Sequence, residues 1–379
     1  MAKTDANYLF VINSLAGGGA ERVMTTLLAR SKDRASDGRL HLALLDKEPA
    51  AYTPPDFVTV HQLDARGGQL ASILQLLKLV RTLKPRLMLS FLTRANVAAV
   101  AVGRLTGVRC VISERVDTAS HFSTTRLKAV KLLAVRTAYG LAERIIAVSA
   151  GVADSLVENF GIVRDKIVVI ENPVDVEAIR TKGAEAPSIP LDPPFVVGVG
   201  RLVPNKNFRL LIDAFAASGV PGKLVILGEG PERPALTQRI AELGLSDRIA
   251  LPGFAANPFA VVSRAAIFVL PSNAEGFPNG LLEGMSLGVP VISANCASGP
   301  SEVLADEPRR PLEDKVAAAY GVLTPVDNVD AMASALRLLQ DPELRRRYGA
   351  LAEQRARMYS PDMATSRYWA VLEPDAPAA

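Results

Sequence analysis

Two glutamates, Glu275 and Glu283, flank a Gly-Phe-Pro-Asn-Gly turn in the second half of the chain. The apolar run Ile267–Leu270 predicts a buried strand before this turn, and residues 281–288 predict a short helix after it. A helix N-terminus attracts anions through its free backbone N–H groups and its dipole. Because carboxylates accept hydrogen bonds from hydroxyls, the segment suits a ligand that is both polyol and phosphate, such as a nucleotide sugar. The alternative interpretation is that Glu275 only caps the helix.

Two cations follow the strand predicted at Phe195–Val199. Arg201 and Lys206 lie in the Gly-Arg-Leu-Val-Pro-Asn-Lys-Asn segment that comes directly after this strand. A guanidinium binds a diphosphate bidentately and an ammonium binds it as a point charge. Both would neutralise the charge that develops on a departing diphosphate. The alternative is a pair of solvated surface cations.

Glycine-rich turns end several of the predicted strands. Gly17-Gly-Gly19 separates the first strand from a helix that starts near Ala20, and such a loop lets the backbone approach a phosphate. It lacks the G-x-G-x-x-G spacing of a dinucleotide site. Gly228-Glu-Gly-Pro231 and Pro252-Gly253-Phe254 end two later strands, and turn geometry alone explains both.

Strands alternate with helical segments along most of the chain. The predicted strands are Tyr8–Ile12, His41–Leu45, Phe57–Gln62, Leu87–Phe91, Arg109–Ser113, Arg144–Val148, Lys166–Ile170, Phe195–Val199, Lys223–Leu227, Arg248–Leu251, Ile267–Leu270, Val289–Ser293 and Gly321–Thr324. Helical patterns include Leu70–Leu83, Asn96–Leu105, Phe208–Ala217 and Arg233–Leu243. This alternation predicts an α/β fold with two doubly wound, Rossmann-like parallel sheets.

Residues Glu171–Pro194 are rich in Pro, Ala, Asp and Glu, and we interpret them as an interdomain linker. The predicted N-terminal domain covers residues 1–185 and the predicted C-terminal domain covers residues 186–360. A C-terminal helix at 361–379 is expected to pack back on the first domain. Open α/β sheets bind ligands beyond the carboxyl ends of their strands, so we expect the two domains to face a central cleft.

Length and composition restrict the function. The 379 residues suggest two domains, and a net charge of +4 without basic runs among aromatics argues against nucleic acid. Cys110 and Cys296 have no metal-binding or disulfide spacing and are expected to be buried apolar residues. We expect no signal peptide and no membrane-spanning segment, which predicts a cytoplasmic protein.

The order of these motifs resembles the retaining glycosyltransferases of family 4, which have the GT-B fold. The resemblance extends from the first strand to about Tyr359. The matching segments are Gly18-Gly-Ala-Glu21, Gly200-Arg201 with Lys206-Asn207, Gly228-Glu-Gly230, Gly253-Phe254, and Glu275 to Glu283 in an E-x7-E pattern. It implies hexosyl or N-acetylhexosaminyl transfer from a UDP- or GDP-linked donor.

The resemblance also implies how the donor diphosphate is bound. Gly18 and Gly19 would approach it from the N-terminal domain, and the catalytic cations Arg201 and Lys206 would bind it from the C-terminal domain. The backbone N–H groups that would face phosphate are those of Asn279, Gly280 and Leu281. No metal or other cofactor is implied, because cations and helix N-termini neutralise the leaving group. The chain contains no Asp-x-Asp metal motif.

The rest of the donor is implied to contact the glutamates and one turn. Glu275 would receive hydroxyls of the transferred sugar and act as a catalytic residue, and Glu283 would receive the ribose. The backbone of Gly253 and Phe254 would meet the base.

Two further segments resemble a subgroup that extends lipid-linked glycans in bacteria. They are Ser90–Asn96 and Ile112–Asp117, and their acceptor-side candidates are Asn96, Glu114 and Arg115. Several relatives have His where this chain has Arg115, so a side-chain base is harder to assign. The leaving phosphate is then the implied base. The alternative is that Ser113-Glu-Arg only caps the segment that follows it.

Residues 124–139 combine basic and apolar side chains at helical spacing, which suits contact with an anionic membrane. An ordinary surface helix is the alternative. The implied acceptor is a polyprenyl-diphosphate-linked or other glycan, and the predicted location is the cytoplasm or the inner face of its membrane. Alternative functions are a sucrose-type synthase of the same fold and a non-catalytic nucleotide-sugar-binding protein. The missing dinucleotide fingerprint disfavours a nicotinamide dehydrogenase.

Overall fold

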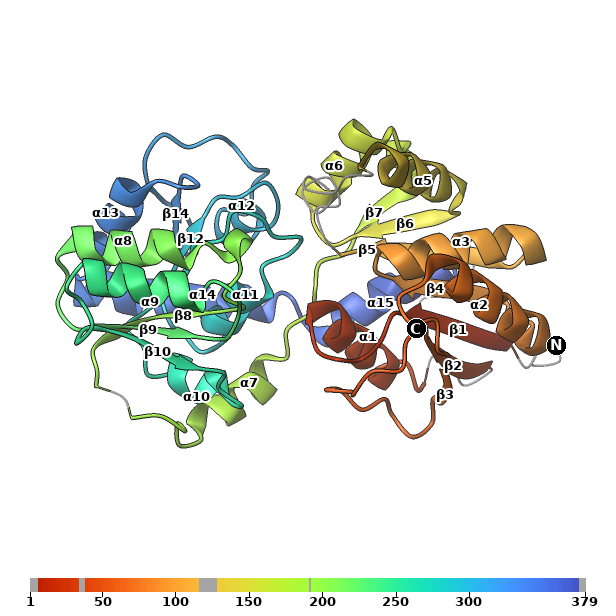
Figure 1. Ribbon diagram of the computed structural model, residues 1–379, viewed down its shortest axis with the longest axis horizontal. Helices are drawn as coiled ribbons and strands as arrows, with labels where there is room; N and C mark the ends of the chain where they lie inside the picture. Colours follow the sequence, from red (N-terminus) through yellow and green to blue (C-terminus); the bar gives the residue numbers. More distant parts are fainter. Residues whose placement is uncertain (1–5, 34–37, 116–127, 191, 375–379) are drawn as a thin grey trace. The chain divides into compact units, whose positions relative to one another are not determined.

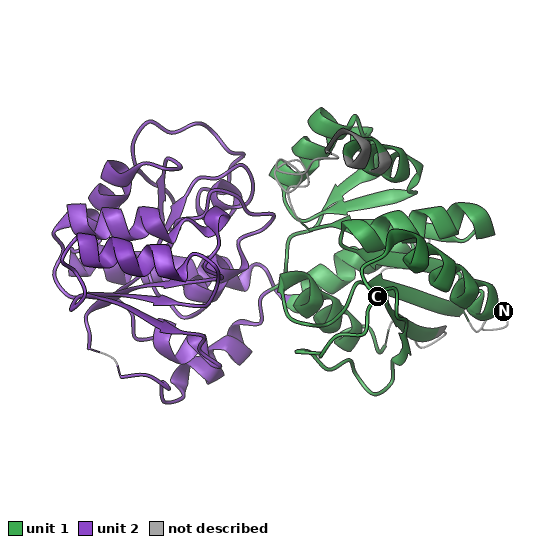
Figure 2. Ribbon diagram, viewed as in Figure 1, with its two compact units in different colours: residues 1–173, 361–379 green, residues 174–360 purple. Residues whose placement is uncertain are grey.

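The structure of the protein is a computed structural model that describes residues 6–33, 38–115, 128–190 and 192–374 (Figure 1). The chain forms two compact units (Figure 2). Unit 1 consists of Met1–Pro173 and Pro361–Ala379, and unit 2 consists of Val174–Ser360. The sequence-based division at 185/186 differs from this because helix α7 (Val176–Ala184) contacts α10 (Pro258–Val262) and α11 (Asn279–Ser286) of unit 2.

Unit 1 is built on a seven-stranded parallel sheet in the order β3-β2-β1-β4-β5-β6-β7. The strands are β1 (Ala6–Ile12), β2 (Gly38–Leu44), β3 (Thr59–Gln62), β4 (Leu87–Phe91), β5 (Arg109–Glu114), β6 (Arg144–Ala147) and β7 (Ile167–Val169). The helices are α1 (Gly19–Ala29), α2 (Gln69–Leu83), α3 (Thr93–Thr106), α5 (Lys128–Leu141), α6 (Ala150–Phe160) and α15 (Pro361–Leu372).

Helix α15 belongs to the core of unit 1 although it lies at the other end of the chain. Tyr368, Trp369 and Leu372 join the same buried cluster as strand β1 and helix α1. The Trp369 indole Nε1 donates a hydrogen bond of 2.9 Å to Ser31 Oγ. Because these side chains are 1 to 3% exposed, α15 is part of the folded core of unit 1.

Unit 2 contains a second seven-stranded sheet in the order β10-β9-β8-β11-β12-β14-β13. Its strands are β8 (Phe195–Val199), β9 (Lys223–Leu227), β10 (Ile249–Gly253), β11 (Ile267–Leu270), β12 (Val291–Ala294), β13 (Val316–Ala317) and β14 (Val322–Thr324). Besides α7, its helices are α8 (Phe208–Ser218), α9 (Arg233–Glu242), α10 (Pro258–Val262), α11 (Asn279–Ser286), α12 (Pro300–Leu304), α13 (Val329–Leu338) and α14 (Pro342–Arg357).

The strands of both sheets are parallel except for β13, which pairs antiparallel with β14. Their apolar side chains are buried on both faces, as a sheet covered by helices on both sides requires. The two sheets therefore confirm the predicted class of two Rossmann-like α/β units. Chain order reverses between β1 and β4 in unit 1 and between β8 and β11 in unit 2. Ligands of open α/β sheets bind beyond the carboxyl ends of strands at such switch points.

Candidate active site

A close ion pair lies at the switch point of unit 2. Lys206 Nζ is 2.6 Å from Glu275 Oε1, and the two side chains are 21% and 11% exposed. Lys206 follows β8 in a short 3-10 turn, Pro204–Lys206, and Glu275 follows the neighbouring strand β11. The structure thus brings together a cation and a carboxylate that are 69 residues apart in the sequence.

Asn207 fixes the loop that carries Lys206. Its backbone has the left-handed conformation, with φ of 47°, and its Oδ1 accepts a hydrogen bond from Leu210 N at the start of α8. Its Nδ2 donates to Asn273 Oδ1 at 2.9 Å and to Asp327 Oδ1 at 2.6 Å. Because Asn273 follows β11, the first of these bonds joins the loop of Lys206 to the loop of Glu275.

Ser298 fixes the backbone of Glu275 from the other side. Its Oγ donates a hydrogen bond of 2.5 Å to the Glu275 carbonyl, and the residue is 1% exposed. The neighbouring thiol of Cys296 is also buried, as predicted from the sequence. Burial, and then the negative charge of Glu275, raise the pKa of Cys296 to about 12. This thiol stays protonated near neutral pH, which makes it a poor nucleophile.

Helix α11 begins directly after the Glu275 loop. Glu283 lies on this helix and is half-buried. Two of the three backbone amides expected to face phosphate already donate hydrogen bonds within the protein. The Asn279 N–H donates to the Phe277 carbonyl and the Leu281 N–H donates to the Pro278 carbonyl, each at 3.0 Å. A phosphate would therefore share or replace these bonds. At Gly280, a Cβ atom would only make an ordinary contact with Phe268 at 3.8 Å, so internal packing does not require glycine there.

A cavity of about 290 Å³ lies at the carboxyl ends of β8, β9 and β10 in unit 2. It is lined by Val199, Gly200, Arg201, Leu227, Gly228, Glu229, Phe254, Ala255 and Pro258. Arg201 is exposed, and within the described chain its side chain has no hydrogen bond or ion pair. Its guanidinium is therefore available to a ligand, whereas Lys206 is already paired with Glu275.

The predicted glycine turns contribute residues to the lining of this cavity, among them Gly200 and Gly228. The Gly228 N–H donates to the Gly253 carbonyl at 2.8 Å, and the Gly200 N–H donates to the Leu227 carbonyl at 3.0 Å. Gly228 has φ of +141°, and a Cβ there would lie 1.8 Å from the Gly200 carbonyl oxygen. Close approach of the neighbouring loops therefore requires glycine at position 228, whether or not a ligand is bound.

In unit 1, the glycine-rich loop occupies the expected place between β1 and α1. Gly18 is the N-cap residue of α1, and Gly19 is the first residue of the helix. The Glu21 carboxylate folds back over this turn, so that a Cβ at Gly18 would lie 2.5 Å from Glu21 Oε2. Both glycines lie at the switch point of the unit 1 sheet, between β1 and β4.

The acceptor-side candidates are interior residues of unit 1. Asn96 and Glu114 are 0% exposed, and Arg115 is 7% exposed. Asn96 Nδ2 donates to the Ser113 carbonyl at 2.9 Å and to Tyr139 Oη at 3.1 Å. The Tyr139 hydroxyl in turn donates to Glu114, and burial followed by the Glu114 charge raises the pKa of Tyr139 well above its usual value. These contacts fit a role in positioning neighbouring elements.

Arg115 joins segments from three parts of unit 1. Its Nη1 donates to Tyr368 Oη at 2.6 Å, its Nη2 donates to Asn172 Oδ1, and its guanidinium lies 4.5 Å from the ring centroid of Phe91. Burial lowers the pKa of Arg115, while Tyr368 and then Glu114 oppose this effect. Asn172 lies one residue before the end of the first segment of unit 1, and Tyr368 lies in α15. One guanidinium at the end of β5 therefore links both segments of unit 1.

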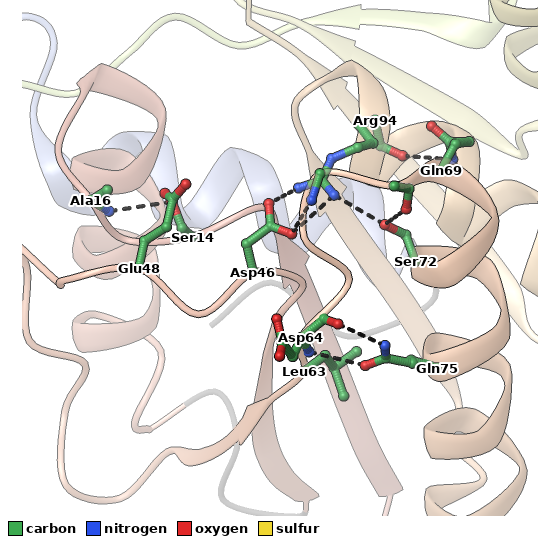
Figure 3. A network of polar contacts seen from close by, with 12 residues as sticks. Ser14, Ala16, Asp46, Glu48, Leu63, Asp64, Gln69, Ser72, Gln75 and Arg94 are labelled. Atoms are coloured by element: carbon green, nitrogen blue, oxygen red, sulfur yellow. Dashed lines mark hydrogen bonds and ion pairs between the residues drawn. The ribbon is translucent and has the colours of Figure 1, made fainter.

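Sequence reasoning did not identify the polar network near β2 and β4 (Figure 3). Arg94, at the start of α3, forms an ion pair with Asp46, and their side chains are 17% and 12% exposed. Arg94 Nη1 also donates to Ser72 Oγ at 3.1 Å, and the Gly67 N–H donates to Asp46 Oδ1 at 2.9 Å. Arg94 lies inside the Ser90–Asn96 segment, but its partner is 48 residues away, and spacing alone does not reveal such a pair.

Several expectations concern features at the limits of the described chain. Of the basic segment 124–139, residues 124–127 lie outside the described residues, and α5 covers Lys128–Leu141. On α5, Leu133 is 63% exposed and Leu141 is 47% exposed.

Among the described residues, no helix has the length and apolarity that crossing a bilayer requires. In the same residues, no group of three or more His, Cys, Asp or Glu side chains could hold a metal ion.

The fold and the strand-end residues together define the class of protein. The chain has two Rossmann-like units, and an ion pair and an apolar cavity lie at the strand ends of unit 2. This is the GT-B architecture of nucleotide-sugar-dependent glycosyltransferases. The chain belongs to the family 4 glycosyltransferases. Residues 17–178 match the family described as Glycosyltransferase Family 4, and residues 180–355 match Glycosyl transferases group 1. The protein is a glycosyltransferase.

One curated relative aligns along almost the whole chain. It is the N-acetylgalactosamine-N,N'-diacetylbacillosaminyl-diphospho-undecaprenol 4-alpha-N-acetylgalactosaminyltransferase of Campylobacter jejuni, with 32% identity over 362 residues. The match covers 92% of this chain and 94% of that protein.

Solved structures share the fold at lower identity. Anabaena HepE in complex with UDP superposes with a TM-score of 0.76 at 20% identity, covering 97% of this chain and 100% of that one. Sucrose-phosphate synthase from Thermosynechococcus elongatus gives a TM-score of 0.77 at 16% identity, covering 97% and 98%. At these identities the superpositions show the fold alone, so they do not favour a sucrose-type synthase over other transferases.

Proposed function

We propose that the protein transfers a hexosyl or N-acetylhexosaminyl group from a UDP-linked donor to a polyprenyl-diphosphate-linked glycan, with retention of configuration. The observation that carries this proposal is the Lys206–Glu275 ion pair at the switch point of unit 2. The diphosphate of a nucleotide-sugar donor needs a cation, and the hydroxyls of its sugar need a hydrogen-bond acceptor. The donor can therefore bind Lys206 through its diphosphate and Glu275 through its sugar.

The proposed donor site lies on unit 2. Arg201 and Lys206 bind the diphosphate, Glu275 accepts hydrogen bonds from the sugar, and Glu283 accepts them from the ribose. The cavity at β8, β9 and β10 takes the base. We propose a uridine nucleotide, the kind of ligand that the solved HepE complexes with UDP and with UDP-glucose contain.

In the proposed reaction, the bond between the anomeric carbon and the diphosphate oxygen breaks, and a bond to the acceptor hydroxyl oxygen forms on the same face. The acceptor proton passes to an oxygen of the departing diphosphate. Arg201 and Lys206 stabilise the charge that develops on this leaving group, and we propose that no metal ion is needed. Preorganised charges of this kind commonly contribute about a hundredfold or more to the rate.

The acceptor class is proposed from the relative in Campylobacter jejuni, whose name specifies a diphospho-undecaprenol glycan. Asn96, Glu114 and Arg115 are proposed as positioning residues, because all three are buried among other side chains of unit 1. Peripheral contact with an anionic membrane is proposed for α5. The exposed Leu133 and Leu141 can enter the lipid interface, and the exposed Arg136 can meet anionic headgroups.

A donor panel tests the proposal and separates it from the alternatives. UDP, GDP and their hexose and N-acetylhexosamine conjugates are compared by thermal shift, because a ligand at a hundred times its Kd stabilises by about 2.7 kcal/mol. The best donor is then incubated with a synthetic polyprenyl-diphosphate-linked glycan in EDTA. We expect a glycosylated product. Binding without transfer to any glycan would favour a non-catalytic nucleotide-sugar-binding protein, and transfer only to a free hexose phosphate would favour a sucrose-type synthase.

For the membrane contact, Leu133→Asp combined with Arg136→Glu should reduce binding to vesicles that contain anionic lipid. Transfer to a short water-soluble acceptor should persist in this variant. Unchanged vesicle binding would make α5 an ordinary surface helix.

A further inference from the structure

A carboxylate held by a buried hydroxyl lies at the carboxyl edge of the unit 1 sheet (Figure 3). Ser14 follows β1 and Glu48 follows β2, and these two strands are neighbours in the sheet. Ser14 Oγ donates a hydrogen bond of 2.6 Å to Glu48 Oε2. Ser14 is 6% exposed, whereas Glu48 is exposed. Within the described chain, Oε1 of Glu48 accepts no hydrogen bond, so it is available to a ligand.

The loop that carries Glu48 is anchored on both sides of this residue. The Asp46 N–H donates to the Asn13 carbonyl, and the Ala51 N–H donates to the Leu15 carbonyl, each at 2.8 Å. The loop after β2 is therefore bonded to the loop after β1 just before and just after Glu48. A carboxylate presented from an anchored loop loses little conformational entropy when a ligand binds it.

The charges of this network favour a hydroxyl over a phosphate as the group that Glu48 binds. The cation in the network of Figure 3 is Arg94, and the Asp46 carboxylate already neutralises it. Glu48 adds a negative charge that no cation of the network opposes. A carboxylate repels a phosphate and accepts hydrogen bonds from hydroxyls, so the site suits a sugar.

We propose that Glu48 accepts hydrogen bonds from hydroxyls of the acceptor glycan and thereby helps to select the acceptor sugar. This inference rests on the proposed function, because it requires a glycan acceptor. Ser14 is a positioning residue that orients the carboxylate, and the Arg94–Asp46 pair fixes the loop. An acceptor that lacks the matching hydroxyl leaves Glu48 without this partner, which is a strong basis for discrimination.

The acceptor is favoured over the donor because its hydroxyls have no other assigned partner. The proposed donor site provides partners for the diphosphate, the sugar and the ribose on unit 2. In unit 1, Asn96, Glu114 and Arg115 are buried and bonded to other side chains of the protein. Glu48 is exposed at the sheet edge where the chain order reverses, and ligands of open α/β sheets bind at such places.

Steady-state kinetics of the full chain tests this role. The substrates are the UDP-sugar that the donor panel selects and the polyprenyl-diphosphate-linked glycan. Glu48→Ala should raise the acceptor KM by about 10-fold to about 150-fold, with the donor KM within about twofold of wild type. Ser14→Ala should raise the acceptor KM by about 2-fold to about 10-fold without lowering kcat. Glu158→Ala removes another exposed carboxylate of unit 1, on α6, and is the matched control that should change neither KM.

Two further ligands identify the group that Glu48 contacts. Monodeoxy analogues of the acceptor sugars each lack one hydroxyl. Wild type should discriminate against at least one of them, and Glu48→Ala should lose that discrimination, as a double-mutant cycle between residue and hydroxyl requires. Polyprenyl diphosphate without a glycan should inhibit wild type and Glu48→Ala equally, because Glu48 is assigned to the sugar.

The failure of this inference and the failure of the proposed function are distinguishable. If wild type glycosylates the acceptor but Glu48→Ala keeps the same acceptor KM, the assignment of Glu48 is wrong and the proposed function stands. The same holds if Glu48→Ala still discriminates against the deoxy analogue, or if it changes only the inhibition by polyprenyl diphosphate. If wild type transfers a sugar to no glycan, the proposed function fails and the assignment fails with it.

Discussion

Replacing Glu275 by glutamine should strengthen the binding of a nucleoside diphosphate while it impairs sugar transfer. In the structure, Lys206 donates a hydrogen bond of 2.6 Å to Glu275, and both side chains are largely buried. A nucleoside diphosphate has no transferred sugar, so it needs Lys206 but offers nothing to Glu275. It must therefore draw Lys206 away from the carboxylate before it can bind fully. Glu275→Gln removes the competing negative charge and keeps the shape of the side chain.

The size of the effect follows from the strength of the bond that the ligand replaces. A hydrogen bond between charged groups contributes about 1.5–3 kcal/mol, and solvent access to this pair reduces the gain. We expect Glu275→Gln to bind UDP about 3-fold to 30-fold more tightly, at about 1.4 kcal/mol for each factor of ten. The transfer rate should fall by about a hundredfold or more, because the sugar loses a charged partner that acts in the reaction.

A double-mutant cycle isolates the competition between ligand and carboxylate. Calorimetric titration with UDP compares wild type, Glu275→Gln, Lys206→Met and the double variant. The gain from Glu275→Gln should vanish when Lys206 is already methionine, since no cation then remains to be released. Glu283→Gln is the matched control and should weaken UDP binding, because Glu283 is assigned to the ribose. Weaker UDP binding by Glu275→Gln, or an equal gain in both backgrounds, would refute this reasoning.

Three further predictions concern the phosphate contact of Arg201 and the stability of unit 1. Trp369, the only tryptophan in the sequence, lies in the core of unit 1, so its fluorescence reports the unfolding of this unit. Arg201→Ala should lower transfer by about a hundredfold with an unchanged melting temperature, and full activity would remove Arg201 from the site. Arg115→Leu should destabilise unit 1 by about 3 kcal/mol in urea, because it removes the hydrogen bonds that the buried guanidinium donates to Tyr368 and Asn172, whereas Arg30→Leu at an exposed ion pair should cost less than about 1 kcal/mol. Burial lowers the pKa of His41 and of His61, so the folded state binds fewer protons than the unfolded state, and stability should fall as the pH drops below about 6.5. Replacing both histidines by glutamine should flatten that pH dependence, and an unchanged slope would assign it to other groups.

The sequence predicted the two sheets well because buried parallel strands are nearly continuous apolar runs. Residues 87–91 and 267–270 were predicted with the bounds that β4 and β11 have in the structure. Helix α7 was missed because its apolar periodicity is weak within a segment rich in Pro, Ala and Glu, so Glu171–Pro194 is not the uniform linker that its composition suggested. The two-residue strand β13 is too short to leave a pattern.

The candidate site was only partly accessible from the sequence. Strand ends placed Lys206 and Glu275 at one edge, but their pairing depends on which loops meet in space. The same limit applies to Asp46 and Arg94. Asn96, Glu114 and Arg115 remain acceptor-side candidates. The sequence did not reveal that Asn96 lies within α3, that Glu114 ends β5, or that all three side chains are buried in unit 1.

The most direct test of the central claim is the anomeric configuration of the product formed without metal. Full-length protein is incubated in EDTA with the α-linked UDP-sugar that the donor panel selects and a synthetic polyprenyl-diphosphate-linked glycan, and the new linkage is assigned by NMR. In the proposed mechanism, the acceptor attacks on the face that the diphosphate leaves, with Arg201 and Lys206 stabilising the leaving group. We therefore expect an α-linked product, formed in EDTA as fast as with added metal ion. A β-linked product, or transfer that occurs only after Mg²⁺ or Mn²⁺ is added, would contradict it.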